Sequence, residues 1–144
     1  MRLLSSYHRS ATAGALAATL WGLSEGFDQK ALRYDYSDIA LLGKAVTRGP
    51  SWRRAGFALH ALNGAAFGVA YEAASRRTGV ERRRLALGMA LAEHVGLYPL
   101  AFFVDRYHPA RGQAGVPPLL RSPRAFLQAT WRHVVFGTAL GRLA

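Results

Sequence analysis

Hydrophobic and small residues form four long segments along the chain, separated by connections in which charged residues gather. The segments are Ser10–Phe27, Ala55–Ala74, Leu85–Val104 and Ala125–Arg142. Each has about 18 to 20 residues, close to the roughly 20 that an α-helix needs to cross the hydrocarbon core of a bilayer. The pattern predicts an all-α fold, a four-helix transmembrane bundle, that uses the 144-residue chain as a single domain.

Small residues recur at intervals of four within these segments. This spacing places them on one stripe of a helix, where they allow two backbones to approach closely. We therefore expect glycines on these stripes to lie at helix–helix contacts. They are Gly14, Gly22, Gly64, Gly68, Gly96, Gly137 and Gly141.

The connections add one short helix and one loop to this plan. Ser37 precedes the apolar stretch Asp38–Val46, a pattern typical of an N-capped helix. Its apolar content predicts an amphipathic helix on the bilayer surface, between the first and second segments. Pro99 predicts a kink in the third helix, and four prolines within Asp105–Arg124 predict an extended loop.

Charge and composition support a membrane location. The chain has 19 Lys and Arg against 8 Asp and Glu, a net charge of +11, and its basic residues flank the hydrophobic segments. This placement favours anionic lipid headgroups over nucleic acid as partners, and predicts a multi-pass protein of the cell (inner) membrane. The five arginines of the short Ser75–Arg84 connection favour cytoplasmic termini, whereas the total count of basic residues on each side favours the opposite orientation.

Polar residues within the hydrophobic segments are the candidate functional groups. Successive residues of a helix are turned by 100°, and with this geometry one polar residue or more from each of the four segments can face a common interior of the bundle. His94 follows Glu93 directly and so points about 100° away from it. The connectivity places Glu93 and His133 near mid-membrane, and Glu25 and His60 at a cavity entrance facing the two long connections. The expected set is Glu25, His60, Asn63, Glu93 and His133.

Three interpretations of this set remain open. The groups could form a proton or substrate pathway, since ionisable residues inside membranes carry such functions. They could instead pair with one another, or with Arg132, to hold the helices in register. Two Glu and two His could also ligate a divalent cation, but neither HxxxH nor ExxH spacing occurs, so we predict no metal site and no cofactor.

Two stretches of the chain are related in pattern. His60–Gly68 and His133–Gly141 both place a histidine before an apolar stretch that contains Phe-Gly. The ending His-x-x-Phe-Gly-x-x-Leu-Gly also resembles that of small bacterial four-helix inner-membrane proteins of unknown function, the YagU-like proteins. The resemblance implies membrane residence and carries over no activity and no functional residues.

The sequence therefore predicts a non-enzymatic membrane protein, either permease-like or an accessory subunit. One alternative is a scaffold or assembly factor, in which the small-residue stripes serve a homo-oligomer or a membrane partner. A second is a lipid-modifying enzyme whose arginines hold a phosphate. A third is a basic helical protein that binds nucleic acid in solution. The GxSxG and P-loop motifs are both absent from the sequence.

Overall fold

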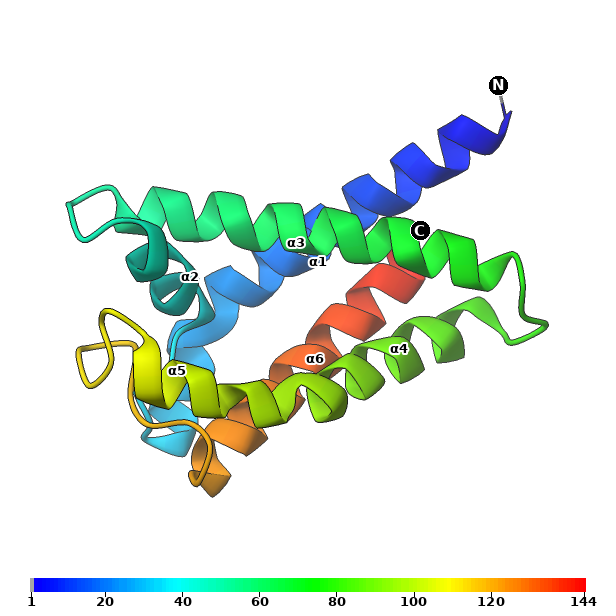
Figure 1. The fold of residues 1–144 in the computed structure, drawn as a ribbon. Helices are drawn as coiled ribbons and strands as arrows, with labels where there is room; N and C mark the ends of the chain where they lie inside the picture. Colours follow the sequence, from blue (N-terminus) through cyan, green and yellow to red (C-terminus); the bar gives the residue numbers. More distant parts are fainter. Residues whose placement is uncertain (1) are drawn as a thin grey trace.

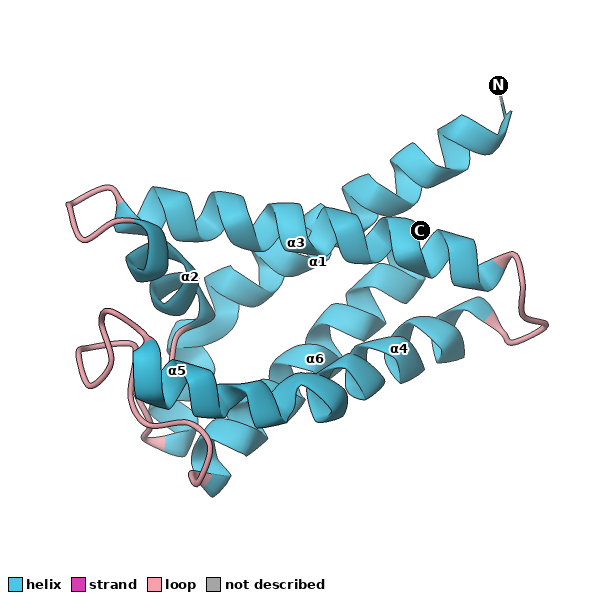
Figure 2. Cartoon of the chain, viewed as in Figure 1, coloured by secondary structure: helices cyan, strands magenta, loops and turns pink. Residues whose placement is uncertain are grey.

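The computed structural model describes residues 2–144, and within this range the chain is all-helical, with six α-helices, one short 3₁₀ helix and no strand. The prediction of an all-α fold is confirmed (Figures 1 and 2). The elements are α1 (Arg2–Leu32), α2 (Asp38–Val46), α3 (Trp52–Ser75), α4 (Arg82–Leu97), η1 (Tyr98–Leu100), α5 (Ala101–Tyr107) and α6 (Pro123–Leu143).

Side-chain caps define where several helices begin. Ser37 Oγ accepts a hydrogen bond from the Ala40 amide at 3.0 Å, so the predicted capped helix is confirmed as α2. The Glu81 carboxylate accepts from the amides of Arg83 and Arg84 at the start of α4. Pro99 lies in η1, which separates α4 from α5, because proline cannot donate the amide hydrogen bond that a continuous α-helix requires.

The long helices pack as two close pairs. α1 lies against α3 and also contacts α6, while α4 lies along α6 (Figure 1). α2 packs against α3. By contrast, α3 and α4 are joined by a short connection but make few contacts with each other. The bundle is therefore tight on three sides and open between α3 and α4.

Glycines occupy the closest backbone approaches. A Cβ atom at Gly14 would lie 2.0 Å from the carbonyl oxygen of Gly64, and one at Gly68 would lie 2.0 Å from the carbonyl oxygen of Ser10. On the other pair, a Cβ atom at Gly137 would lie 2.9 Å from Leu87 Cα. Any side chain at these positions would force the two backbones apart.

The remaining stripe positions differ from one another. A Cβ atom at Gly22 would lie 2.9 Å from the side chain of Ile39 in α2, and one at Gly141 would lie 3.0 Å from Arg83 Cα. Gly96 is exposed, and no atom lies within 4 Å of its position for a Cβ. The expectation that Gly96 packs against another helix is therefore wrong within this chain.

Gly96 is exposed because α4 presents a different face to the bundle from the one expected. The inward face of α4 carries Ala86, Ala90 and His94, all buried. We expected Glu93 to point into the bundle. The observed inward face is centred on His94 instead, so the helix is turned by roughly one residue, or 100°, from the expected orientation. Helical spacing relates residues within α4 but leaves the rotation of α4 against α6 undetermined.

The two long connections are joined to each other. Asp105 accepts hydrogen bonds from the amides of Leu119 and Leu120 at 2.7 and 2.9 Å. Ser37 donates its amide hydrogen to the Gly115 carbonyl at 3.0 Å. The loop after α5 is thereby held against the chain that leads into α2, and this end of the bundle is closed by ordered structure.

One helical stretch among the described residues is long and apolar enough, by length and composition alone, to cross a membrane. It is Arg82–Tyr107, which runs through α4, η1 and α5 with a mean hydropathy of 1.4 in its most apolar window.

We predict that Gly64→Ala destabilises the protein by about 1–3 kcal/mol, because the new methyl group would lie against the backbone of α1. Gly96→Ala is the matched control, and should leave the stability unchanged or raise it by up to about 1 kcal/mol through helix propensity. The measurement is the free energy of unfolding in detergent, from titration with SDS followed by circular dichroism. Equal effects of the two substitutions would contradict the close approach of α1 and α3.

Candidate functional site

A single arginine occupies the centre of the buried polar groups. The side chain of Arg132 in α6 has no exposed surface. Its Nε and Nη2 donate to the two carboxylate oxygens of Asp28 at 2.7 and 2.6 Å, and Nη1 donates to Asp38 at 2.7 Å. Nη2 also donates to the Tyr36 carbonyl at 2.8 Å, and Glu25 lies 3.5 Å from Nη1. These groups form the Arg132 cluster: Glu25, Asp28, Tyr36, Asp38 and Arg132.

The carboxylates of this cluster are each held by further donors. Asp38 also accepts from Tyr36 Oη at 2.5 Å and from Trp21 Nε1 at 3.2 Å. Burial alone would raise the pKa of Asp38, but the neighbouring Arg132 guanidinium and the Tyr36 hydrogen bond outweigh burial and hold that pKa below its usual range. Asp38 is therefore charged at neutral pH and pairs with Arg132.

Glu25 serves the start of α2. Its carboxylate accepts from Ser37 Oγ at 2.6 Å and from the Asp38 and Ile39 amides at 2.7 and 3.3 Å. Free amides at a helix N-terminus favour a negative charge, so this contact stabilises both the carboxylate and the helix. The carboxylate of Glu25 therefore holds α2 against α1.

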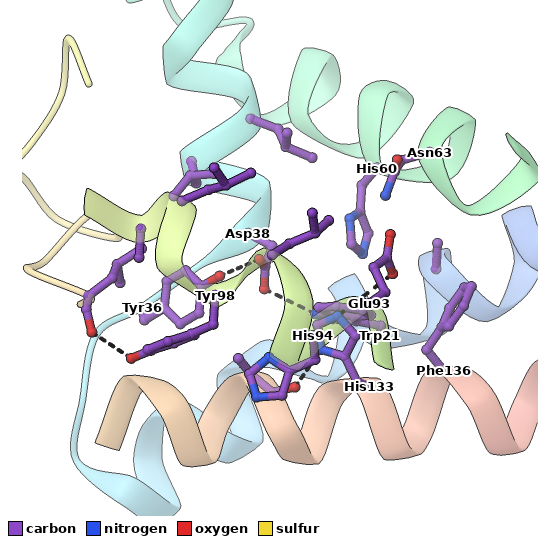
Figure 3. Close-up of a pocket in the computed structure, with 18 of the residues that line it drawn as sticks. Trp21, Tyr36, Asp38, His60, Asn63, Glu93, His94, Tyr98, His133 and Phe136 are labelled. Carbon is purple, nitrogen blue, oxygen red and sulfur yellow. Dashed lines mark hydrogen bonds and ion pairs between the residues drawn. The ribbon is translucent and has the colours of Figure 1, made fainter. Parts of the chain in front are cut away.

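A pocket of about 270 Å³ lies beside the Arg132 cluster, between α1, α2, α3, α4 and α6. Side chains from all these helices point into it (Figure 3). Its polar and aromatic lining comprises Trp21, Tyr36, Asp38, His60, Asn63, Phe67, Glu93, His94, Tyr98, His133 and Phe136.

Three imidazoles line this pocket in different states of hydrogen bonding. His94 Nε2 lies 2.9 Å from Thr130 Oγ1, and His133 Nδ1 lies 2.7 Å from the Ala129 carbonyl. His60 is 5% exposed, and its Nε2 has no hydrogen-bond partner among the described residues. A buried polar atom without a partner costs free energy, and is where a bound molecule would be expected to supply one.

Glu93 faces the pocket, and few groups around it can balance the charge of its carboxylate. The nearest basic side chain is His133, whose Nε2 lies 3.9 Å from a Glu93 carboxylate oxygen. The side chain of Glu93 is 29% exposed. Of the polar groups that line the pocket, Glu93 is therefore the acid that has no arginine partner in the part of the chain the structure describes.

The pocket reaches the surface between α3 and α4. The exposed members of its lining are Asn63 on α3, Leu97 on α4 and Leu100 on η1, and the others are buried or partly buried. These positions lie on the open side of the bundle. We expected the pocket to open toward the two long connections. The exposed lining residues instead mark an opening between α3 and α4.

The structure thus brings four of the five expected residues to one pocket, namely His60, Asn63, Glu93 and His133, and places Glu25 outside its lining. It adds His94, which we expected to point away. His94 lines the pocket because α4 is rotated, so that His94 lies against α6 and Glu93 lies beside it on the flank.

Asp28 and Asp38 were missed in the sequence as partners of Arg132. Pairing of the interior set with Arg132, one of the open interpretations, is observed for Glu25 at 3.5 Å. Trp21, Glu25 and Asp28 are spaced i, i+4 and i+7, which places them on one helical face. That spacing could have indicated an acidic face on an otherwise apolar helix. Asp38 could not have been found in this way, because its role as a pocket residue depends on how α2 folds back onto α1 and α3.

Within residues 2–144, no group of three or more His, Asp or Glu side chains is arranged to hold a metal ion. No protein-family model, curated protein sequence or solved structure matches the chain. The function is therefore argued from the geometry of the pocket and of the surface around it.

We predict that Arg132→Gln destabilises the protein by about 3–5 kcal/mol, because it leaves buried carboxylates without their counter-ion. Arg142→Gln, on the exposed end of the same helix, is the control and should change the stability by less than about 0.5 kcal/mol. SDS titration of both purified variants measures the difference. A similar stability for the two variants would show that the Arg132 cluster contributes little to the fold.

Proposed function

We propose that the protein is an integral membrane protein whose four long helices, α1, α3, α4–α5 and α6, span the inner membrane, and that it acts in a permease-like manner. In this proposal the pocket between the helices receives a small ligand and allows it to pass across the bilayer. The observation that carries the proposal is a pocket lined by Glu and His at the middle of helices whose outer surfaces are apolar.

Several polar side chains are buried in the protein, while many large apolar side chains are exposed on it. The largest side chains with almost no exposed surface include Arg132, Gln128 and Ser10. The exposed side chains include many large apolar ones, which are unfavourable in water and favourable in lipid. Examples are Leu16, Leu20, Leu23, Phe27, Leu62, Val69, Val95, Leu97, Phe102, Phe103, Leu127 and Trp131.

These apolar side chains form stripes along single helices. On α1 the exposed residues Leu16, Leu20, Leu23 and Phe27 follow intervals of four, three and four, the spacing of one helical face. The opposite face of α1 carries the buried Glu25 and Asp28 groups. A helix of this kind has a modest average hydropathy although its outer face from Leu16 to Phe27 is apolar.

Helices with one apolar face and one polar face have a low average hydropathy, which is why hydropathy alone identifies a single candidate membrane span, Arg82–Tyr107. Only 17% of the most apolar window of Arg82–Tyr107 is buried in the protein, whereas the core helix of a soluble protein would be mostly buried. The other three long helices have 31, 24 and 21 residues, enough for about 30 Å or more of helix each. Several of their polar residues are buried, and the average over all faces hides this; they are Ser10, Glu25, Asp28, His60, Glu72, Gln128 and Arg132.

The position of the polar groups supports passage rather than surface binding. Asn63 lies at the middle of α3, Glu93 lies in the second half of α4, and His133 lies near the middle of α6. Ionisable groups at such depth are costly unless they serve a pathway or are neutralised by partners. Arg132 and its carboxylates satisfy one another, whereas Glu93 and His60 do not have such partners among the described residues.

We expect the full-length protein to stay in the membrane pellet during alkaline extraction and to dissolve only when detergent is added. The reason is that the exposed apolar stripes on four helices would be transferred into water on release. A known peripheral membrane protein in the same preparation is the control. Release of the chain into the alkaline supernatant would contradict membrane spanning, and would make the +11 net charge the leading clue to its partner.

The permease-like role has a test that needs no knowledge of the substrate, because the chain contains no cysteine. Asn63→Cys places one thiol at the pocket opening, and Leu62→Cys places one on the neighbouring outer surface, where Leu62 is 66% exposed. We expect a membrane-impermeant, water-soluble thiosulfonate to label Cys at position 63 from both sides of the membrane. Position 62, facing lipid, should be labelled from neither side.

Labelling is measured separately in right-side-out and inside-out membrane vesicles. Access to position 63 from both sides is the behaviour of a pathway that opens alternately. Labelling of position 63 from one side only, or from neither, would contradict passage and would favour the scaffold alternative, in which the buried polar groups only hold the helices together.

A further inference from the structure

We infer that the ligand of this pocket is a small lipophilic amine in its protonated, cationic form. The inference rests on the proposed permease-like function and names its substrate class. Four features of the pocket carry it: the charge of its lining, its aromatic walls, the His60 nitrogen that has no partner among the described residues, and the leucines at its opening.

The charge of the lining favours a cation. Two carboxylates, Asp38 and Glu93, line the pocket, and no Lys or Arg does so among the described residues. Arg132 lies behind Asp38 and neutralises it through a 2.7 Å contact, so Glu93 is the carboxylate left to pair with a ligand. An anion placed here would lie beside Glu93 with no Lys or Arg side chain in the described lining to bind it. A cation would supply the missing counter-charge.

Aromatic rings surround the same space. Trp21 lies edge-on to His60 and His133, with ring centroids 4.8 and 4.7 Å apart, and Phe67 lies edge-on to Phe136 at 5.1 Å. Rings of this kind attract organic cations through their negative faces, most strongly where water is excluded. Small inorganic cations prefer oxygen ligands, which this lining offers in small number. The walls therefore favour an organic cation.

His60 indicates that the cation carries a hydrogen. Its Nε2 is buried and without a partner in the described part of the chain, and its ring points into the pocket between Trp21 and α3 (Figure 3). A neutral imidazole that carries its proton on Nδ1 accepts a hydrogen bond at Nε2, and a protonated amine donates one. A quaternary ammonium has the charge but no hydrogen to donate, and so would leave His60 unsatisfied.

The opening indicates how such a ligand enters. Leu97 and Leu100 are exposed at the mouth, on the open side between α3 and α4 that also carries the polar Asn63. A ligand with one charged end and one apolar end can pass this mouth with its apolar part against the leucines. The volume of about 270 Å³ suits an amine with one aromatic ring or a short branched chain.

The test is equilibrium dialysis of the purified full-length protein in detergent at pH 7 with three probes that share a benzyl group, after subtraction of binding to empty micelles. The probes are N,N-dimethylbenzylamine, which is protonated at this pH, quaternary benzyltrimethylammonium, and isobutylbenzene, an uncharged carbon isostere. We expect the protonated amine to bind most tightly, the quaternary ion more weakly, and isobutylbenzene at least about tenfold more weakly than the amine.

Three variants assign the interactions. Glu93→Gln should weaken binding of both cations by about tenfold or more, because it removes the counter-charge. His60→Phe keeps an aromatic ring and removes the acceptor, so it should weaken the protonated amine and leave the quaternary ion unchanged. Glu81→Gln, at the exposed start of α4 and outside the pocket, is the matched acid control and should bind as the parent protein does.

Equal binding of the amine and isobutylbenzene would overturn the inference. So would a Glu93→Gln variant that has an unchanged unfolding transition and still binds both cations as the parent protein does. A lack of binding by all three probes would overturn it as well. None of these results would alter the labelling of position 63 in membrane vesicles, so failure of the substrate class is distinguishable from failure of the permease-like function.

Discussion

The buried guanidinium of Arg132 is the charge on which the arrangement of the other elements depends. It draws Asp28 from α1, Asp38 from α2 and the backbone carbonyl of Tyr36 to within 2.8 Å of α6. A charge without partners in a low-dielectric interior costs several kcal/mol, and so these partners cannot move away independently. One side chain thereby joins the N-terminal half of the chain to its last helix, and explains why α2 folds inward.

The pocket follows from how the helices are paired. Glycine contacts bring α1 against α3 and α6 against α4 so closely that no side chain fits between the backbones. The Arg132 cluster then links α1 to α6. With these contacts made, α3 and α4 are left apart, and the space between them is lined by the His and Glu side chains of their flanks. The open side is thus a consequence of tight packing elsewhere.

Asp38 belongs both to the Arg132 cluster and to the lining of the pocket. Its carboxylate binds Arg132 and also lines the pocket beside Trp21 and His60. A cation in the pocket would therefore lie next to the same acid that holds α2 in place. In the proposed function, this shared group would connect ligand binding electrostatically with the position of α2.

The sequence by itself determined the helices, the capped start of α2, the break at Pro99 and the presence of interior His and Glu, because these follow from local periodicity, capping and backbone constraints. Only the tertiary structure decided that His94 faces inward, that Gly96 does not, that Glu25 holds α2, and that Asp28 and Asp38 meet Arg132. Periodicity relates residues within one helix, whereas these outcomes depend on the rotation of each helix against its neighbours. Contacts across about 100 residues of sequence set that rotation, and no local pattern encodes them.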